Sequence, residues 1–295
     1  MSSPLLSIMI CTQNRADKLA RCLASLETVL PPQESWDVLV VDNGSRDHTK
    51  QAVEAVARRG KIPLRYCFEP QAGLSFARNR GLAQTASPLV AFTDDDCLVD
   101  RAWPRTILRE FDSDASLDVL GGRVDLEDVH DLPFCTRPFP DRCAISSLTQ
   151  IMDRLIGCNM AFRRSVFETV GLFDPRLGIG TRAGSSEDTD LLYRALRTGL
   201  KLCYSPDLII LHAHGRRATH PLSNVHRNYA KGRGAMYCKH ALRGDWAMAK
   251  CFGGELLTLL KNAWMNGPTE PTAYPPQKVF CSLFAGVISR LNKTA

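Results

Sequence analysis

The sequence predicts an α/β fold with a central, mostly parallel sheet flanked by helices and followed by a helical C-terminal extension. In about the first hundred residues, short apolar runs alternate with segments whose apolar residues repeat at helical spacing. Strands that alternate with helices indicate βαβ units and a parallel sheet covered on both faces. Beyond residue 215 the pattern is mainly helical. The 295 residues suffice for one large α/β domain with an appendage.

Four strands and three helices are expected in the N-terminal part. The apolar runs predict strands at residues 6–11, 36–41, 64–68 and 89–92. Helical spacing predicts helices at residues 15–28, 49–59 and 76–86. Ligands of such sheets bind at the carboxyl ends of the strands. Because Thr12, Asp42 and the aspartates at 94–96 follow three of these strands, we expect one crevice to gather them.

The second half of the chain is less regular. Residues 120–150 contain three prolines and mixed polar residues, and we interpret them as a long connection. Later elements are an apolar run at 155–162, a helix near 165–170, a glycine-rich loop at 171–184, a helix at 190–198 ended by Gly199, and a last strand at 208–211. We expect the glycine-rich loop to act as a mobile lid. The chain then divides into one domain at 1–215, with halves at about 1–120 and 121–215, and a C-terminal region at 216–295.

Composition and charge set wide limits on function. The chain is 44% hydrophobic and 23% charged, as globular proteins are, and its formal net charge is +6 with a pI near 8.8. Many of the bases lie in the C-terminal third: Arg216, Arg217, Arg227, Lys231, Arg233, Lys239, Arg243 and Lys250. A basic surface suits nucleic acid, an anionic membrane or a phosphorylated ligand, and composition does not choose among them.

The cysteines and the hydropathy of the chain predict a cytoplasmic location. The eleven cysteines include no C-x-x-C pair and no Cys/His spacing for structural zinc, which is typical of reduced thiols in a cytosol. The N-terminus has no basic region or small-residue cleavage site, so we predict no signal peptide. No stretch approaches the ~18 apolar residues that span a bilayer. We therefore expect a soluble or peripheral protein.

The last segment has two interpretations of equal weight. Its apolar residues repeat at helical spacing: Val279, Phe280, Leu283, Phe284, Val287, Ile288 and Leu291. Lys278, Arg290 and Lys293 accompany them. The pattern is typical of an amphipathic helix on a membrane surface, here the inner face of the cell membrane. It is equally typical of a helix that packs on its own domain or on the partner in a homodimer.

A cluster of aspartates follows the fourth apolar run. Phe92-Thr93-Asp94-Asp95-Asp96 places three carboxylates side by side, and adjacent like charges normally need a cation. Hard oxygen ligands suit Mn²⁺ or Mg²⁺, which commonly join protein carboxylates to phosphates. We expect Asp94 and Asp96 to face the crevice, while Asp95 points away or meets a ribose. The alternative is a solvated acidic turn or a helix N-cap.

Other residues at strand ends and helix starts are weaker candidates. Asp42 can accept a hydrogen bond from a nucleobase or a ribose, although the residues after it also form ordinary turns. His212 can complete the coordination of the same metal, or bind a separate ion together with His214. Arg78 and Arg80 lie early in a helix, where a guanidinium favours phosphate oxygens, or else they cover the surface or pair with an acid.

Glu187 and Asp188 follow the glycine-rich loop and begin a helix. A carboxylate at this place can act as a general base if it reaches an acceptor hydroxyl. Taken alone, the pair is better explained as acids that stabilise a helix start.

The combination of these motifs resembles the family-2 glycosyltransferases over roughly residues 5 to 215. The matching stretches begin with Ser7-Ile-Met-Ile-Cys-Thr-Gln-Asn-Arg15, Val41-Asp-Asn-Gly-Ser45, Gly73-Leu-Ser-Phe-Ala-Arg-Asn-Arg-Gly81 and Asp94-Asp-Asp96. They continue with Gly157-Cys-Asn-Met-Ala-Phe-Arg-Arg164, Gly171-Leu-Phe-Asp174, Glu187-Asp188 and His212. The resemblance implies a GT-A type nucleotide-binding sheet, with a nucleotide-sugar half at about 1–120 and an acceptor half at about 121–215.

The resemblance also implies a donor site. Thr12 and Asp42 are expected to meet the nucleoside, often uridine, and Arg78 to approach the base or the diphosphate. The remaining candidates for donor binding are Asn14, Arg15, Asp94 and Asp95. The partner implied is a nucleotide-sugar donor, most often a UDP-sugar.

The same resemblance implies a metal and a base. Asp94 and Asp96 match the D-x-D motif for Mn²⁺ or Mg²⁺, and His212 matches a further ligand position. Asp188 resembles the general base, with Glu187 beside it to orient the base or the acceptor. The implied reaction is an inverting single displacement, in which the base deprotonates a hydroxyl of a glycan, lipid-linked or small-molecule acceptor. Such a protein takes part in polysaccharide biosynthesis.

Two alternatives belong to other classes. A sugar nucleotidyltransferase would share the sheet and the acidic metal site, but the chain has no glycine-rich, lysine-containing loop near its N-terminus. A non-catalytic glycan-binding module would fit the basic tail but not the retained acids. Motifs for a P-loop and for a dinucleotide fold are missing. Nucleic acid is not an expected partner, because acids in the cleft would repel its phosphates.

Overall fold

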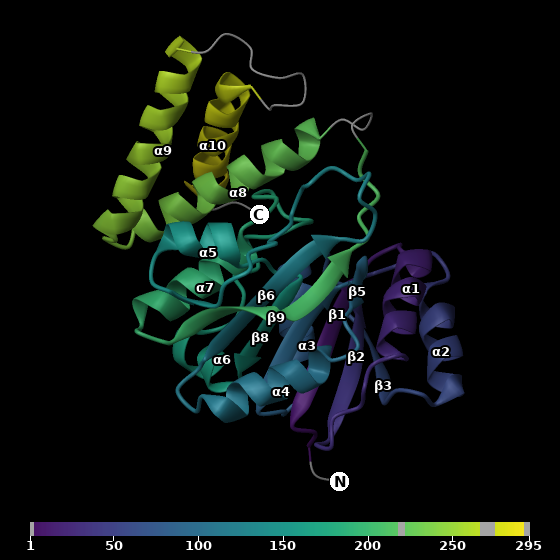
Figure 1. Cartoon of the computed structure of the whole chain (residues 1–295). Coiled ribbons are helices and arrows are strands. Elements are labelled where there is room, and N and C mark those ends of the chain that lie inside the picture. The colour runs from purple at the N-terminus through teal and green to yellow at the C-terminus, as the bar shows by residue number, and fades with distance from the viewer. Residues whose placement is uncertain (1–2, 218–221, 266–274, 292–295) are drawn as a thin grey trace.

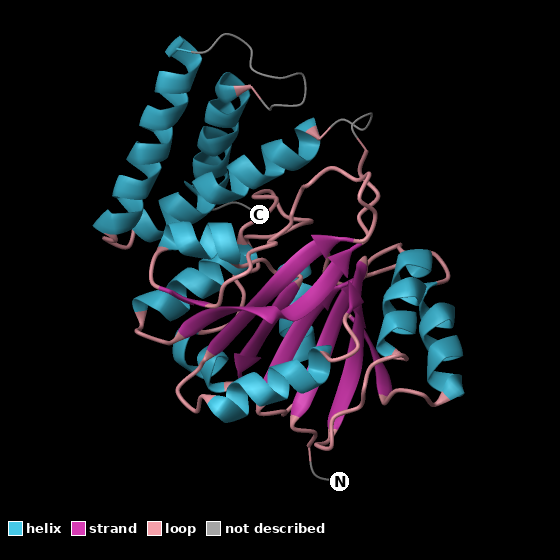
Figure 2. Ribbon diagram, in the orientation of Figure 1, coloured by secondary structure: helices cyan, strands magenta, loops and turns pink. Residues whose placement is uncertain are grey.

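The computed structural model describes residues 3–217, 222–265 and 275–291. A central twisted sheet carries helices on both faces, and the last three helices gather at one end, above the sheet in Figure 1. The N-terminus lies at the opposite end. Figure 2 shows that strands occupy the middle layer and that long loops run over the upper edge of the sheet.

The described residues form nine strands and ten helices. The strands are β1 (Leu6–Thr12), β2 (Trp36–Asp42), β3 (Leu64–Phe68), β4 (Leu89–Asp94), β5 (Cys97–Val99), β6 (Val119–Leu126), β7 (Cys143–Ile145), β8 (Asn159–Arg163) and β9 (Leu202–His212). The helices are α1 (Ala16–Leu26), α2 (Thr49–Arg59), α3 (Leu74–Ala83), α4 (Trp103–Ser113), α5 (Leu148–Arg154), α6 (Ser165–Val170), α7 (Glu187–Arg197), α8 (Ser223–Ala241), α9 (Trp246–Met265) and α10 (Pro276–Leu291).

The strand order is β3-β2-β1-β4-β8-β6-β9-β5, and β7 pairs with β9 beside this path. The four strands from β3 to β4 are parallel. β8 then runs antiparallel to both of its neighbours, β4 and β6, whereas β6 and β9 are again parallel. The predicted α/β class with a helical extension is confirmed. The parallel arrangement covers the N-terminal half of the sheet, and the other half is mixed.

Alternate residues of the central strands feed two separate cores. Ile8 and Ile10 of β1 pack with α1 and α4 on one face, while Met9 packs on the other face. Ala91 and Phe92 of β4 divide in the same way. Both faces are covered, which explains why these strands are continuous apolar runs in the sequence.

Residues 120–150 differ from the long connection that we predicted. They contain most of β6, all of β7 and the start of α5. The β6 strand has no apolar run to reveal it, because Gly121 and Gly122 lie in its middle and Arg123 and Asp125 alternate with apolar residues. The last strand, β9, is also longer than the predicted 208–211 and starts at Leu202.

The helix predicted near the C-terminus exists and packs on its own chain. Gly286 of α10 faces the Lys231 carbonyl of α8, and Gly234 of α8 faces the Leu283 carbonyl of α10, so that a side chain at either glycine would collide with backbone. Leu283 is fully buried in this contact, but part of the apolar face of α10 stays exposed. Lys293, which we counted with this segment, lies outside the described residues. Among the described helices, none is long and apolar enough to cross a membrane.

Candidate active site

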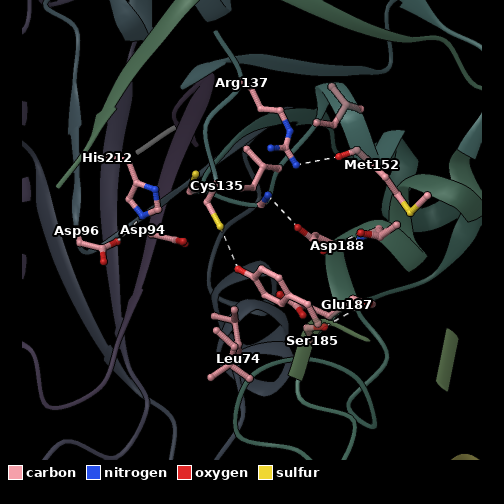
Figure 3. Close-up of a pocket in the computed structure, with 18 of the residues that line it drawn as sticks. Leu74, Asp94, Asp96, Cys135, Arg137, Met152, Ser185, Glu187, Asp188 and His212 are labelled. Atoms are coloured by element: carbon pink, nitrogen blue, oxygen red, sulfur yellow. Dashed lines mark hydrogen bonds and ion pairs between the residues drawn. The ribbon is translucent and has the colours of Figure 1, made fainter. Parts of the chain in front are cut away.

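A pocket of about 280 Å³ opens where β4 and β9 end and α7 begins. Seven of the predicted site residues line it: Arg15, Arg78, Asp94, Asp96, Glu187, Asp188 and His212. Figure 3 shows the two aspartates and His212 on one side of the pocket, and Asp188 and Glu187 on the other. We call the first side the acidic corner. Four predicted residues, Thr12, Asn14, Asp42 and Asp95, are not part of its lining.

The acidic corner is assembled by strand pairing. In the antiparallel ladder of β5 and β9, Cys97 lies opposite His212, and this brings the preceding residue Asp96 next to the imidazole. The His212 Nε2 is 3.4 Å from the Asp96 Oδ1. Ligand atoms of Asp96, Cys97 and His212 all lie within 4.8 Å of one another. Asp94 lines the same pocket, but its carboxylate is not part of this tight group and lies 3.9 Å from the Arg78 Nη2.

The donor set of the corner fits a hard divalent cation. Burial raises the pKa of the Cys97 thiol to about 11, so this residue stays protonated and is a poor ligand. The His212 Nδ1 is buried and has no hydrogen-bond partner in the described part of the chain. Burial also raises the pKa of Asp94, although the charge of Arg78 opposes this effect. Carboxylate oxygens and an imidazole at Asp94, Asp96 and His212 are ligands that Mn²⁺ accepts.

Two basic residues of the loop and helix after β1 partly neutralise the corner. Arg15 bridges the carboxylates, with Nη1 2.7 Å from Asp95 and Nη2 2.6 Å from Asp96. Lys18, which we did not predict, lies 3.4 Å from Asp96. Burial raises the pKa of Asp96, but the hydrogen bond with His212 and the charge of Arg15 outweigh it, and the pKa lies well below its usual range. Asp96 is therefore ionised and available to a cation.

Asp95 points away from the pocket, which is one of the two orientations that we predicted. The Thr12 hydroxyl donates to the Asp95 Oδ2 at 2.7 Å. Burial raises the pKa of Asp95 to about 7, against the charge of Arg15 and the hydrogen bond from Thr12. The two residues thus form a buried polar link between β1 and the acidic cluster.

Asn14 follows the end of β1, and Asp42 is the last residue of β2. The Asp42 carboxylate is buried and accepts hydrogen bonds from the Ser45 amide and the Tyr66 hydroxyl, both at 2.8 Å. Asn14 is exposed, has a φ of +53°, and accepts from the Arg46 amide at 2.7 Å. Both side chains shape the loops at this edge of the sheet.

Asp188 is held by two backbone amides at the start of α7. Its Oδ2 accepts from the Gly157 N–H at 2.9 Å, and its Oδ1 accepts from the Thr189 N–H at 2.7 Å. A side chain at Gly157 would place a Cβ 2.8 Å from both the Asp188 Oδ2 and the Arg78 Nη2, so only glycine permits this approach. The carboxylate is half-buried and faces the pocket with a fixed orientation.

Glu187 makes a buried ion pair with Arg78. The Arg78 Nη1 is 2.9 Å from the Glu187 Oε1. The Arg78 guanidinium lies 5.2 Å from the ring centroid of Phe173 and 5.7 Å from that of Phe92. Burial, together with the charge of Asp188, raises the pKa of Glu187 to about 7 despite Arg78. Arg78, predicted as a donor contact, thus links Glu187 to Asp94.

The glycine-rich loop at 171–184 contacts the start of α3. The Leu74 amide donates to the Ile179 carbonyl at 3.0 Å, and the Ser75 hydroxyl donates to the Leu177 carbonyl at 2.8 Å. Leu177 is fully buried, whereas the Ile179 side chain lines the pocket. In this structure the loop forms part of the pocket wall, and its motion stays a prediction.

Another part of the wall comes from segments to which we assigned no role. They are the loop between β6 and β7, the residues after β9, and α8, which contribute Cys135, Arg137, Arg216, Tyr229 and Arg233. For Arg216 and Arg233, the one indication in the sequence is that they belong to the basic C-terminal third. Cys135, Arg137 and Tyr229 do not belong to any motif that we recognised.

Comparisons with known proteins concern the family of the chain and its fold. The family model described as glycosyl transferase family 2 matches residues 7–171. Glycosyltransferase AglE of Haloferax volcanii is 27% identical over 211 residues, which are 71% of this chain and 67% of AglE. Several other matches to curated relatives cover a smaller share of the relative's length, and one of them spans only 23% of it.

Solved structures share the fold. The mannosyltransferase PcManGT from Pyrobaculum calidifontis, in complex with GDP-Man and Mn²⁺, aligns with a TM-score of 0.64 at 16% identity, over 100% of this chain and 89% of its own. TarS 1-349 of S. aureus, in complex with UDP-GlcNAc, aligns with a TM-score of 0.59 at 20% identity, over 79% and 65%. Since the family match spans more than half of the chain, the protein is a glycosyltransferase that belongs to family 2.

Proposed function

We propose that this glycosyltransferase is inverting and metal-dependent, and that it moves a sugar from a nucleoside-diphosphate donor to an acceptor hydroxyl. One observation carries the proposal. A single pocket holds a pair of metal-binding groups, Asp96 and His212, and a carboxylate, Asp188, that two amides fix in place. A metal site and an oriented base are the two parts that such a displacement requires.

Asp94, Asp96 and His212 would hold Mn²⁺ or Mg²⁺. When bound, the ion supplies positive charge that offsets the charge developing on the leaving diphosphate. Arg15 and Lys18 keep Asp96 ionised and add positive charge to the same corner. The solved neighbours with GDP-Man and UDP-GlcNAc support a nucleotide-sugar donor. We favour a UDP-sugar, with the nucleoside contacted by the edge that Thr12, Asn14 and Asp42 shape.

In the proposed reaction, Asp188 accepts the proton of the acceptor hydroxyl as that oxygen attacks the anomeric carbon. The amides of Gly157 and Thr189 orient its carboxylate and leave its remaining lone pairs for the acceptor. Glu187 also lines the pocket, and its ion pair with Arg78 holds its carboxylate in place next to Asp188. Closure of the loop at 171–184 would exclude water from the donor.

The acceptor is a glycan, a lipid-linked sugar or a small molecule, and we propose that the C-terminal helices bring the chain to a membrane. Large apolar side chains stay exposed on and before α9 and on α10: Leu242, Trp246, Leu257, Leu260, Phe284, Ile288 and Leu291. Co-sedimentation with anionic vesicles would drop for a chain that ends before residue 276. Unchanged binding would remove this part of the proposal, and a monomer–dimer shift on deletion would favour a homodimer instead.

A thermal-shift panel of nucleotide sugars with Mn²⁺ or Mg²⁺ tests the proposed donor and metal. A ligand that binds only the folded protein raises its melting temperature, so no knowledge of the acceptor is needed. We expect one nucleotide sugar to stabilise the protein only when the ion is present, and then to yield nucleoside diphosphate. Pyrophosphate release from a nucleoside triphosphate would favour a nucleotidyltransferase. Binding of glycans without any donor would favour a binding module.

A further inference from the structure

Arg216 and Tyr229 belong to one wall of the pocket, and the Phe134 ring, which does not itself line the pocket, packs against both. The Phe134 ring stacks on the Tyr229 ring, with centroids 5.5 Å apart and planes 11° from parallel. The Arg216 guanidinium lies over the same Phe134 ring at 5.5 Å. The Tyr229 hydroxyl is 3.1 Å from the Cys135 sulfur. These contacts join the loop between β6 and β7, the residues after β9, and α8 into one preformed surface.

Arg216 and Arg137 differ from the other arginines of the pocket. Arg15, Arg78 and Arg233 each lie within 3 Å of a carboxylate, on Asp95 and Asp96, on Glu187, and on Glu255. For Arg216 and Arg137, no carboxylate of the described residues is within ion-pair distance.

The Arg137 guanidinium is held in place by neutral groups. Its Nη1 donates to the Thr136 carbonyl at 2.7 Å and its Nη2 to the Met152 carbonyl at 2.8 Å. The Nε is buried and has no hydrogen-bond partner among the described residues. A buried donor without a partner is costly, so this guanidinium is prepared for an acceptor that the protein does not itself supply.

Arg137 and Arg216 line the same pocket as Cys135 and Tyr229. Burial raises the pKa of the Cys135 thiol to about 11, and the charges of both Arg216 and Arg137 oppose that effect. Burial likewise raises the pKa of Tyr229, with Asp188 adding to the rise and Arg216 opposing it. The two guanidinium groups and the Asp188 carboxylate thus border the same pocket.

We propose that Arg137 and Arg216 form an anion subsite that binds a phosphate or carboxylate group carried by one of the two sugar substrates. The inference rests on the proposed transfer and adds the chemical class of a substrate. The planar guanidinium fork matches both anions in geometry, and burial strengthens such charge-assisted hydrogen bonds. In the proposed transfer the metal at the acidic corner would bind the diphosphate of the donor, so we assign the anion bound by Arg137 and Arg216 to a second group.

The phosphate or carboxylate group can belong to the acceptor or to the sugar of the donor, and two binding experiments distinguish these sources. For the acceptor, a hexose 1-phosphate is titrated by calorimetry into the protein with Mg²⁺, first without nucleotide and then with saturating UDP or GDP, with a neutral methyl hexoside as reference. For the donor, UDP-glucuronate is compared with UDP-glucose in the presence of Mg²⁺. The variants are Arg137→Gln and Arg216→Gln, with Arg216→Lys to keep the charge without the fork.

We expect each glutamine variant to weaken binding of the anionic ligand about tenfold in one of the two experiments, which is the size of one charge-assisted hydrogen bond. The neutral ligand should bind as before, and Arg216→Lys should recover part of the loss. The matched control is Arg227→Gln, which removes one exposed charge from α8 outside the pocket. Unchanged melting temperatures identify variants that are folded.

Three results would overturn the subsite. Equal affinity of wild type and both variants for the anionic ligands would do so. An equal loss with Arg227→Gln would mean a general charge effect. A tenfold loss for UDP or GDP itself would make the arginines part of the diphosphate site. By contrast, a wild type that binds the hexose 1-phosphate through these arginines but binds no nucleotide with Mg²⁺ would sink the proposed transfer and leave the subsite standing.

Discussion

Two groups of carboxylates, one at the pocket and one where α7, α8 and α10 meet, differ in how the chain neutralises them. One is the acidic corner, where burial raises the pKa of Asp94, while the hydrogen bond with His212 and the charge of Arg15 outweigh burial and lower the pKa of Asp96. The other, which we call the anchor cluster, consists of Asp174, Asp190, Lys239, His240 and Arg290. In the anchor cluster, burial also raises the pKa of both aspartates, but the contacts of Lys239 and His240 outweigh it, and the pKa of each is lowered.

The difference lies in the cations that the chain provides. Lys239 is 2.7 Å from Asp190 and 3.0 Å from Asp174, and His240 is 2.9 Å from Asp190. Arg290 of α10 lies 3.2 Å from Asp174. The anchor cluster is thus complete, and it ties the C-terminal helices to the helix that carries Asp188. At the acidic corner, by contrast, Arg15 and Lys18 are 39% and 35% exposed, and the buried Arg78 is 3.9 Å from Asp94, so the chain neutralises these aspartates less completely.

The largest effect on stability is expected for Lys239→Met. The change removes the cation shared by two buried carboxylates, and breaking such a pair costs about 3–5 kcal/mol. Urea denaturation measures the free energy of unfolding, with Lys250→Met, an exposed lysine of α9, as control. A loss below about 1 kcal/mol would mean that the anchor cluster does not hold the helices.

For Asp96→Asn we expect a smaller effect that depends on ligand. Without metal, stability should change by no more than about 1 kcal/mol, because the asparagine oxygen can still accept from the buried His212, and Arg15 is 39% exposed to water. With Mn²⁺ and a nucleoside diphosphate at a hundred times its Kd, the wild type should gain about 2.7 kcal/mol, and the variant should lose most of that gain. Exposed Asp112→Asn serves as control. Equal stabilisation of Asp96→Asn and wild type would place the metal elsewhere.

We expect the stabilisation that the anchor cluster provides to be lost at low pH. The pKa of Asp174 is about 2 in the folded protein, below its ordinary value, since Lys239 and Arg290 outweigh burial. A lowered pKa stabilises the fold at pH values above about 4, and this contribution of about 2 kcal/mol is lost as the pH falls toward 2. Unfolding measured between pH 5 and pH 2.5 should show a decline that is smaller in Asp174→Asn. A parallel decline in both proteins would contradict the assignment.

Much of the N-terminal part of the sheet could be predicted, because β1, β2 and β4 are buried on both faces and appear as apolar runs. Their ends then locate the acidic corner. The β6 strand could not be predicted, since glycines and alternating polar residues hide it. The pairing of Asp96 with His212 needs the β5–β9 ladder, which joins segments more than a hundred residues apart.

The basic C-terminal third shows the limit of sequence patterns most clearly. Lys239 is one of several bases that look alike in the sequence, yet it is buried against Asp174 and Asp190, while Lys250 is exposed. Tyr229 enters the pocket because of where α8 packs, and no motif surrounds it. Such roles depend on tertiary contacts between residues far apart in the chain, which a local pattern does not contain.

The central claim is that the acidic corner binds the donor and Asp188 performs the proton transfer, so the two functions should separate. The direct measurement compares Asp188→Asn with the wild type in the presence of Mn²⁺, and it records both the affinity for the nucleotide-sugar donor and the rate at which nucleoside diphosphate is released from that donor. The remaining oxygen of the asparagine can still accept from the Gly157 amide. The exposed control is Asp17→Asn. We predict donor affinity close to that of the wild type and release slower by about 10²–10⁴, the usual contribution of a general base. Release at the wild-type rate would contradict the account.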